Sequence, residues 1–174
     1  KVGVTDLVSN YGGIAGSDSA FVISTETNRR AIPKVGKIWK SDGEFFTVSK
    51  SSVAAVGETV VMSGMNNNTG FETGKVLLIN ATVTFDGGGT LTNQVITDYK
   101  TLPGDSGGTV FQPNSDGQDT VSLLGINVGG SEKQDITPQP SGAPNPDTNL
   151  YGIYSPWTNV EADLGGNWTI VGDY

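Results

Sequence analysis

One serine in the chain stands among residues that suit nucleophilic chemistry. Ser106 lies in the run PGDSGG, residues 103–108, where a proline and three glycines surround Asp105 and the serine. A serine hydroxyl is a weak nucleophile until a neighbouring base accepts its proton. Histidine is the usual base, and none of the 174 residues is a histidine. Ser106 is therefore either a nucleophile whose base lies elsewhere or a serine in an ordinary turn between two strands.

The residues next to Ser106 predict a pair of hydrogen-bond donors. Gly104 tolerates backbone conformations that turn its N–H inward, and together with the N–H of Ser106 it would aim two donors at one oxygen. Such donors stabilise the negative charge that develops on a carbonyl oxygen during acyl transfer, by roughly 3–4 kcal/mol each. Asp105 is expected to be buried at the turn, where it needs a cation or hydrogen-bond donors.

The elements that must position this turn have the pattern of β-strands. Apolar and polar residues alternate in runs rich in β-branched and aromatic residues, with Gly, Asn and Asp between the runs. Asp86–Gly89 is expected to be the tip of a hairpin. A further strand is expected near residues 2–8. The other predicted strands are residues 18–25, 34–40, 58–65, 74–85, 89–97, 119–129 and 149–155.

A helix is expected near the C-terminus. Ser155 can cap its start and Pro156 suits its first position, while the two glycines at 165–166 would end it. Residues 136–148 contain four prolines and are expected to form an extended surface loop. Many short strands with one terminal helix predict an all-β barrel or sandwich. The residues expected on the buried face of the helix are Trp157, Val160 and Leu164.

Composition excludes several classes of partner. The net charge of −8 and the pI near 4.3 argue against nucleic acid and against an anionic membrane surface. No apolar run reaches the ~18 residues of a membrane span. The chain has no cysteine or histidine, its acidic residues lack calcium-loop spacing, and no glycine-rich loop precedes a helix. We therefore expect no metal and no cofactor.

Four further stretches, taken with PGDSGG, resemble the chymotrypsin-like serine peptidases, in particular the secreted bacterial branch that includes streptogrisins and α-lytic protease. In order they are SDSAFVIS (17–24), residues 55–85, LLGINVGGS (123–131) and YSPWTNVEADLG (154–165). The family fold is two six-stranded antiparallel β-barrels with the active site between them. The resemblance implies that residues 1–52 supply closing strands of the first barrel. Residues 53–174 would form the second barrel and the C-terminal helix.

The resemblance also implies roles for individual residues. Ser106 would be the nucleophile, Asp18 the carboxylate that orients the histidine, and Gly104 with Ser106 the oxyanion donors. Gly129 and Gly130 would pair with the substrate backbone as an added strand. The residues expected to bind substrate are Thr101, Leu102, Pro103, Val128, Gly129 and Gly130.

The chain departs from the family pattern at two places. Val128 stands where the family usually has a hydroxyl residue that supports the aspartate, which would cost a buried carboxylate about 1–3 kcal/mol. The family histidine lies upstream of the aspartate, and only 17 residues precede Asp18. We therefore expect a partner, an N-terminal chain of the same precursor that carries the histidine and covers the incomplete first barrel. The first residue, Lys1, fits a processed chain or a piece of a longer protein.

Three functions are consistent with these residues. The first is a secreted serine endopeptidase that acts on a protein or peptide substrate with the histidine of the partner chain. The second is a catalytically inactive protease-like scaffold that serves as a binding or structural module. The third is an esterase or amidase that uses the same serine.

Overall fold

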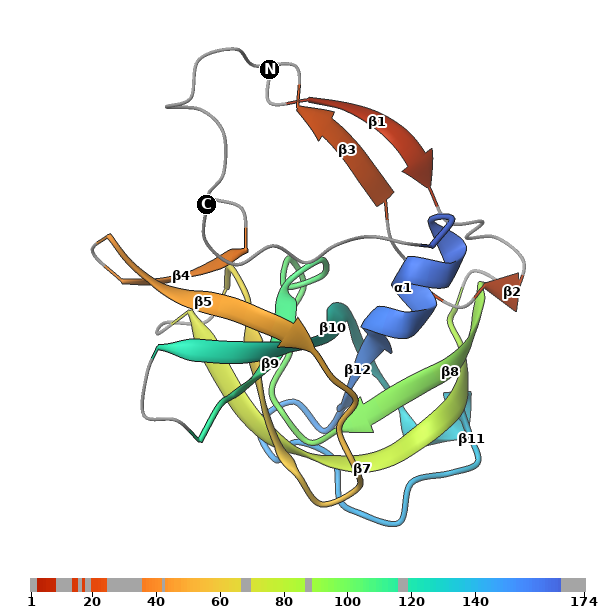
Figure 1. The fold of residues 1–174 in the computed structure, drawn as a ribbon. Coiled ribbons are helices and arrows are strands. Elements are labelled where there is room, and N and C mark those ends of the chain that lie inside the picture. The colour runs from red at the N-terminus through yellow and green to blue at the C-terminus, as the bar shows by residue number, and fades with distance from the viewer. Residues whose placement is uncertain are drawn as a thin grey trace.

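The computed structural model describes residues 3–8, 14–15, 17, 20–24, 36–41, 43–66, 70–86, 89–115 and 119–166. Within these ranges the chain is mostly β-strand, so the predicted all-β class is confirmed (Figure 1). No helix in the described ranges is long and apolar enough to span a membrane. Asp18 lies outside the described residues.

The strands are β1 (Gly3–Val8), β2 (Ile14–Ala15), β3 (Ala20–Ser24), β4 (Lys37–Ser41), β5 (Glu44–Ser51), β6 (Thr59–Ser63), β7 (Phe71–Thr84), β8 (Thr90–Thr97), β9 (Thr109–Pro113), β10 (Thr120–Ser131), β11 (Ile136–Thr137) and β12 (Tyr151–Pro156). Eight of the strands coincide with the predicted runs, and β2, β5, β9 and β11 fall outside them. The helices are the 3-10 turn η1 (Lys133–Asp135) and α1 (Trp157–Asp163).

Six of these strands close into an antiparallel barrel. β7 pairs with β6, β6 with β9, β9 with β10, β10 with β12, β12 with β8, and β8 again with β7. The hairpin between β7 and β8 is confirmed, since the N–H of Phe85 donates to the carbonyl of Gly89 at 2.9 Å. In Figure 1 these strands wrap around the lower part of the molecule, and α1 follows directly from β12.

Apolar side chains fill the barrel and exclude water from it. One buried cluster is Ala54, Val60, Met62, Val76, Val95, Tyr99, Val110, Leu124 and Tyr154, and its members come from the barrel strands and the segments that join them. A second cluster, which includes Val128 and Tyr151, packs between β7, β8, β10 and β12. The side chains of both clusters fix the strands that flank the serine turn.

The hairpin of β4 and β5 extends the barrel sheet. β5 pairs with β4 and, in parallel, with β10. The alternation did not predict β5, because Phe45 and Phe46 are consecutive in its sequence. Phe46 packs against Phe71 and Phe111, with ring centroids 5.9 and 5.3 Å apart, so an aromatic cluster holds this strand. The hairpin before residue 52 thus shares a sheet with strands after it, and the division of the chain at residue 52 stays a prediction.

The N-terminal strands contact the barrel at few points in the described part of the chain. β1 and β3 form a separate antiparallel pair, drawn apart from the barrel in Figure 1. β2 pairs in parallel with β8. Ser17 is buried, and its N–H and hydroxyl both donate to Oδ2 of Asp163, at 2.7 and 2.9 Å. These two bonds tie the residue before Asp18 to the C-terminal end of α1.

The start of α1 differs from the prediction and its end agrees. Ser155 does not cap the helix, because it belongs to β12 and its hydroxyl donates to Oε1 of buried Gln94 at 2.8 Å. Pro156 is the N-cap residue and not the first helical residue. The predicted glycines at 165–166 follow the helix with φ of 93° and 72°. Of the predicted buried face, Val160 and Leu164 are buried and Trp157 is half-buried.

The proline-rich segment after η1 is largely irregular, as predicted. Only residues 136–137 of it form a strand, β11, which pairs with β7. The hydroxyl of Tyr151 donates to the carbonyl of Gly142 at 2.8 Å and anchors the segment to the start of β12.

The close approach of β10 and β12 requires glycine at position 125. A Cβ on Gly125 would lie 2.0 Å from the carbonyl oxygen of Ser155, a backbone atom that has no rotamer in which to move away. We expect Gly125→Ala to lower the free energy of unfolding by about 3 kcal/mol or more. The matched control is Gly43→Ala, where φ is +90° and no atom lies within 4 Å, so only backbone strain of about 1–2 kcal/mol is expected. Equal losses in urea unfolding would contradict this packing.

Candidate active site

Ser106 sits on a tight turn between the end of β8 and the start of β9. Gly104 and Gly107 on either side of it have φ of 101° and 84°, values that L side chains rarely adopt. The side chain of Ser106 is exposed, and its hydroxyl donates to the carbonyl of Val128 on β10 at 2.7 Å. The two glycines therefore allow a backbone that presents the serine hydroxyl at the surface.

Backbone hydrogen bonds hold the turn against β10. The N–H of Gly107 donates to the carbonyl of Asn127 at 2.8 Å, and the N–H of Asn127 donates to the carbonyl of Gly108 at 2.7 Å. Within the turn, the N–H of Gly108 donates to the carbonyl of Asp105 at 3.0 Å. The two residues that follow Ser106 are thus hydrogen-bonded to the barrel strand β10.

Asp105 is buried beneath the turn, as the sequence predicts. It is 1% exposed, and its carboxylate accepts the N–H of Asn66 at 2.8 Å and the N–H of Leu102 at 2.9 Å. No lysine or arginine of the described residues forms an ion pair with it. Backbone amides therefore stabilise this charge. The lack of a side chain at Gly64 makes space for this carboxylate, because a Cβ there would lie 2.4 Å from Oδ1 of Asp105.

A buried polar network supports the other side of the turn. The hydroxyl of Tyr99 donates to Oδ1 of Asn127 at 2.9 Å. The Nδ2 of Asn127 donates to the carbonyl of Asp105 at 2.9 Å and to Oγ1 of Thr101 at 3.2 Å. Burial raises the pKa of Tyr99 well above its usual range, so the phenol remains a neutral donor. Asn127 was not predicted from the sequence, although a lone amide in the apolar run LLGINVGG was a usable signal.

The N–H groups of Gly104 and Ser106 are the two predicted oxyanion donors. Among the described residues, neither the N–H of Gly104 nor that of Ser106 donates to a backbone carbonyl. Both belong to the turn that presents the serine hydroxyl. Unpaired N–H groups beside an exposed hydroxyl are what stabilisation of a tetrahedral oxyanion requires.

The structure brings several of the predicted substrate-binding residues close to Ser106. A Cβ on Gly129 would lie 3.9 Å from the Ser106 hydroxyl oxygen, and one on Gly130 would lie 3.1 Å from Cγ2 of Thr101. The side chain of Val128 points into the apolar core, so this residue reaches the site through its carbonyl.

The remaining two positions of the predicted cleft precede the turn directly. Leu102 is half-buried and Pro103 is exposed. A cavity of about 310 Å³ next to Gly130 is lined by carboxylates of Asp86, Glu132 and Asp135, which give this flank a negative potential.

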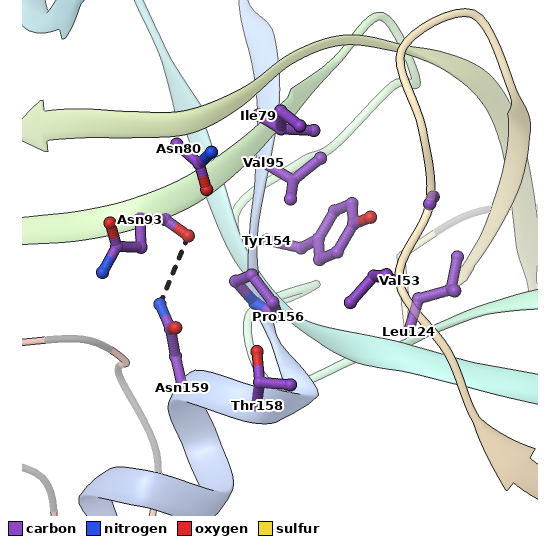
Figure 2. Close-up of a pocket in the computed structure, with 11 residues that line it drawn as sticks. Val53, Ile79, Asn80, Asn93, Val95, Leu124, Tyr154, Pro156, Thr158 and Asn159 are labelled. Atoms are coloured by element: carbon purple, nitrogen blue, oxygen red, sulfur yellow. Dashed lines mark hydrogen bonds between the residues drawn. The ribbon is translucent and has the colours of Figure 1, made fainter.

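A second cavity lies on a different part of the barrel. It measures about 470 Å³ and opens between β7, β8, β10, β12 and the start of α1 (Figure 2). Apolar side chains such as Val95 and Leu124 line it together with asparagines, and Figure 2 shows the amide of Asn159 bonded to the carbonyl of Asn93, at 3.2 Å. None of its lining residues is Asp, Glu, Lys or Arg. The described residues include no group of acidic side chains that could hold a metal ion.

Two curated relatives are serine proteases. Serine protease 2 of Streptomyces fradiae is 30% identical over 129 residues, which are 74% of this chain and 68% of that protein. Streptogrisin-A of Streptomyces griseus is 31% identical over 96 residues, which are 55% of this chain and 29% of that protein. No protein-family model matches the chain.

Solved structures give the same fold. A glutamic acid specific serine protease that uses a histidine triad in substrate binding aligns with a TM-score of 0.67 and 26% identity, over 94% of this chain and 72% of that one. The chymotrypsin of Cellulomonas bogoriensis aligns with a TM-score of 0.64 and 24% identity, over 90% and 71%. The fold is therefore that of the chymotrypsin-like proteases. The chain belongs to the bacterial serine proteases of this fold, the branch that includes the streptogrisins.

The support of Asp105 by backbone amides can be tested by substitution. Asp105→Asn replaces one carboxylate oxygen by an NH2 group that must face a backbone N–H, and the unpaired donors would cost about 1–3 kcal/mol. The control is Asp98→Asn, because Asp98 is half-buried and accepts a single backbone N–H, from Lys75 at 2.6 Å, which an Asn carbonyl can also accept. We expect Asp105→Asn to lower the urea midpoint clearly more than Asp98→Asn does. Equal midpoints would contradict the assignment.

Proposed function

We propose that this chain is the catalytic-serine chain of a secreted serine endopeptidase, with Ser106 as nucleophile and with a histidine supplied by a separate N-terminal chain. The observation that carries the proposal is the exposed Ser106 hydroxyl on a turn whose two N–H groups, at 104 and 106, have no backbone acceptor among the described residues. Relatedness to serine proteases supports a peptide or protein substrate.

The need for an external base follows from the contact that the hydroxyl makes. Ser106 donates to the carbonyl of Val128, and a peptide carbonyl does not accept a proton at neutral pH. A histidine is the usual acceptor, and the 174 residues contain none. Rotation about the Cα–Cβ bond of Ser106 would exchange the Val128 carbonyl for an incoming imidazole.

The reaction would proceed through an acyl-enzyme. The Ser106 oxygen attacks the carbonyl carbon of the peptide bond while the imidazole takes its proton, and the N–H groups of Gly104 and Ser106 stabilise the oxyanion. The C–N bond then breaks, and the amine leaves with the proton from the imidazolium. Water, deprotonated by the same imidazole, then attacks the ester carbonyl carbon. The bond between this carbon and the Ser106 oxygen breaks, the serine oxygen takes the proton from the imidazolium, and the acid product leaves. In this proposal Asp18 orients the imidazole, Gly129 and Gly130 pair with the substrate backbone, and residues 101–103 line the cleft.

The alternative is an inactive protease-like scaffold that binds a partner through the same cleft. The valine at 128, in place of a supporting hydroxyl residue, favours it, as does the lack of a histidine in this chain. The bonded Asp105 and the unpaired N–H groups favour the enzyme, because a scaffold has no need of them.

Labelling with a fluorophosphonate separates the two functions. We expect the protein isolated from its source, with every associated chain, to incorporate one label per molecule at Ser106, because the base activates that hydroxyl alone. Ser106→Ala, expressed in the same way, is the control and should take up none. Absence of label from the native protein would favour the scaffold.

Intact mass spectrometry of the labelled protein under denaturing conditions tests the partner chain. We expect a second polypeptide that carries a histidine. A histidine found on one continuous polypeptide with Ser106 would refute the separate chain while leaving the nucleophile in place.

A further inference from the structure

We propose that Asn66 and Asn127 are positioning residues that orient the two oxyanion N–H groups. The inference rests on the proposed function of Ser106 and adds how this chain prepares its oxyanion site. Neither asparagine is needed to contact the substrate. Each acts on the peptide group that carries one of the two donors.

Each asparagine amide holds the carbonyl end of one of these peptide groups. Nδ2 of Asn66 donates to the carbonyl of Pro103, whose peptide bond carries the N–H of Gly104. Nδ2 of Asn127 donates to the carbonyl of Asp105 at 2.9 Å, and that peptide bond carries the N–H of Ser106. The Asn66 amide thus acts on the peptide group of the Gly104 N–H, and the Asn127 amide acts on that of the Ser106 N–H.

Peptide planarity converts a held carbonyl into a directed N–H. Neither of these two peptide bonds is cis, so in each the C=O and the N–H point in opposite directions. An amide that fixes the carbonyl therefore turns the N–H away from itself. This accounts for two N–H groups that have no backbone acceptor in the described part of the chain although their carbonyls are bonded.

Each asparagine makes a further contact, Asn66 through its main chain and Asn127 through its side chain. The backbone N–H of Asn66 donates to Oδ1 of buried Asp105 at 2.8 Å, and a Cβ on Gly104 would lie 2.3 Å from Nδ2 of Asn66. Asn127 is 1% exposed and accepts the hydroxyl of Tyr99 at 2.9 Å. The partners of the buried Asn127 amide thus fix its direction, whereas Asn66 is exposed and is anchored through its main chain and its bond to Pro103.

The peptide group of Gly104 depends most on this support. Gly104 has φ of 101° and no side chain to restrict its backbone. The carbonyl of Pro103, in the same peptide group, accepts no backbone N–H among the described residues. The carbonyl of Asp105, in contrast, also accepts the N–H of Gly108 at 3.0 Å. Loss of the Asn66 amide should therefore free the N–H of Gly104 to rotate more than loss of the Asn127 amide frees the N–H of Ser106.

The test measures steady-state kinetics with a peptide ester on the native protein, with every associated chain present. Loss of an oxyanion donor lowers kcat by about 100- to 1,000-fold. A donor that is present but misdirected should cause only part of this loss of kcat, so we expect Asn66→Ala to lower kcat by roughly 10- to 100-fold. KM should change less than twofold, and the inhibition constant of a peptide aldehyde should rise by the same factor as kcat falls, because the aldehyde adduct carries the oxyanion.

Two controls separate orientation from general loosening. Met65→Ala truncates the neighbouring side chain, which is 81% exposed, and should leave kcat unchanged. Ser155→Ala removes the buried hydrogen bond to Gln94, remote from the turn, and should lower the melting temperature without changing kcat. For Asn127, the isosteric variant Asn127→Asp replaces the NH2 donor of the amide with a carboxylate oxygen, which cannot donate to the carbonyl of Asp105. If this variant does not fold, Asn66→Ala and its two controls decide the test.

The outcomes distinguish this inference from the proposed function. A wild-type protein that hydrolyses the ester, together with unchanged kcat and aldehyde affinity in Asn66→Ala, would overturn the positioning role and leave Ser106 as nucleophile. An equal loss of kcat in Ser155→Ala would overturn it as well, since the loss would then follow stability. A wild-type protein that neither hydrolyses the ester nor takes up fluorophosphonate would refute the proposed function itself.

Discussion

The buried carboxylate of Asp105 is the interaction on which the serine turn depends. It accepts one backbone N–H from the β6–β7 loop, at Asn66, and one from its own segment, at Leu102. A buried charge without such partners costs several kcal/mol, so the two loops must meet around it whenever the chain is folded. The same meeting brings the Asn66 amide to the carbonyl of Pro103. One desolvated carboxylate thus determines the local geometry of the candidate site.

The six-stranded barrel supplies the rigid frame for this turn. β10 holds it from one side through the main chain of Asn127, and the carbonyl of Val128 on the same strand accepts the Ser106 hydroxyl. The chain therefore presents the proposed nucleophile and two N–H groups on fixed elements, while the proton acceptor is proposed to come from outside it.

The sequence was most informative where a single physical rule decides the structure. Alternation predicted β7, β8 and β10, and the glycines at 165–166 predicted the end of α1. The sequence was less informative where tertiary contacts override local preference. The consecutive Phe45 and Phe46 break the alternation, so β5 was not predicted. Ser155 donates to Gln94 instead of capping the helix. PGDSGG identified the turn. The roles of Asn66 and Asn127 needed the fold, because both amides act on residues distant in sequence.

The pH dependence of acylation shows whether an imidazole from outside this chain activates Ser106. The rate at which a nitrophenyl ester acylates Ser106 should be followed in the native protein, with every associated chain, from pH 5 to pH 9. An imidazole base predicts a sigmoidal rise with a midpoint at about pH 6.5, where histidine ordinarily titrates. Because this chain contains no histidine, such a step would report a base supplied from outside it. A rate proportional to hydroxide concentration over the whole range, with no step, would contradict the account.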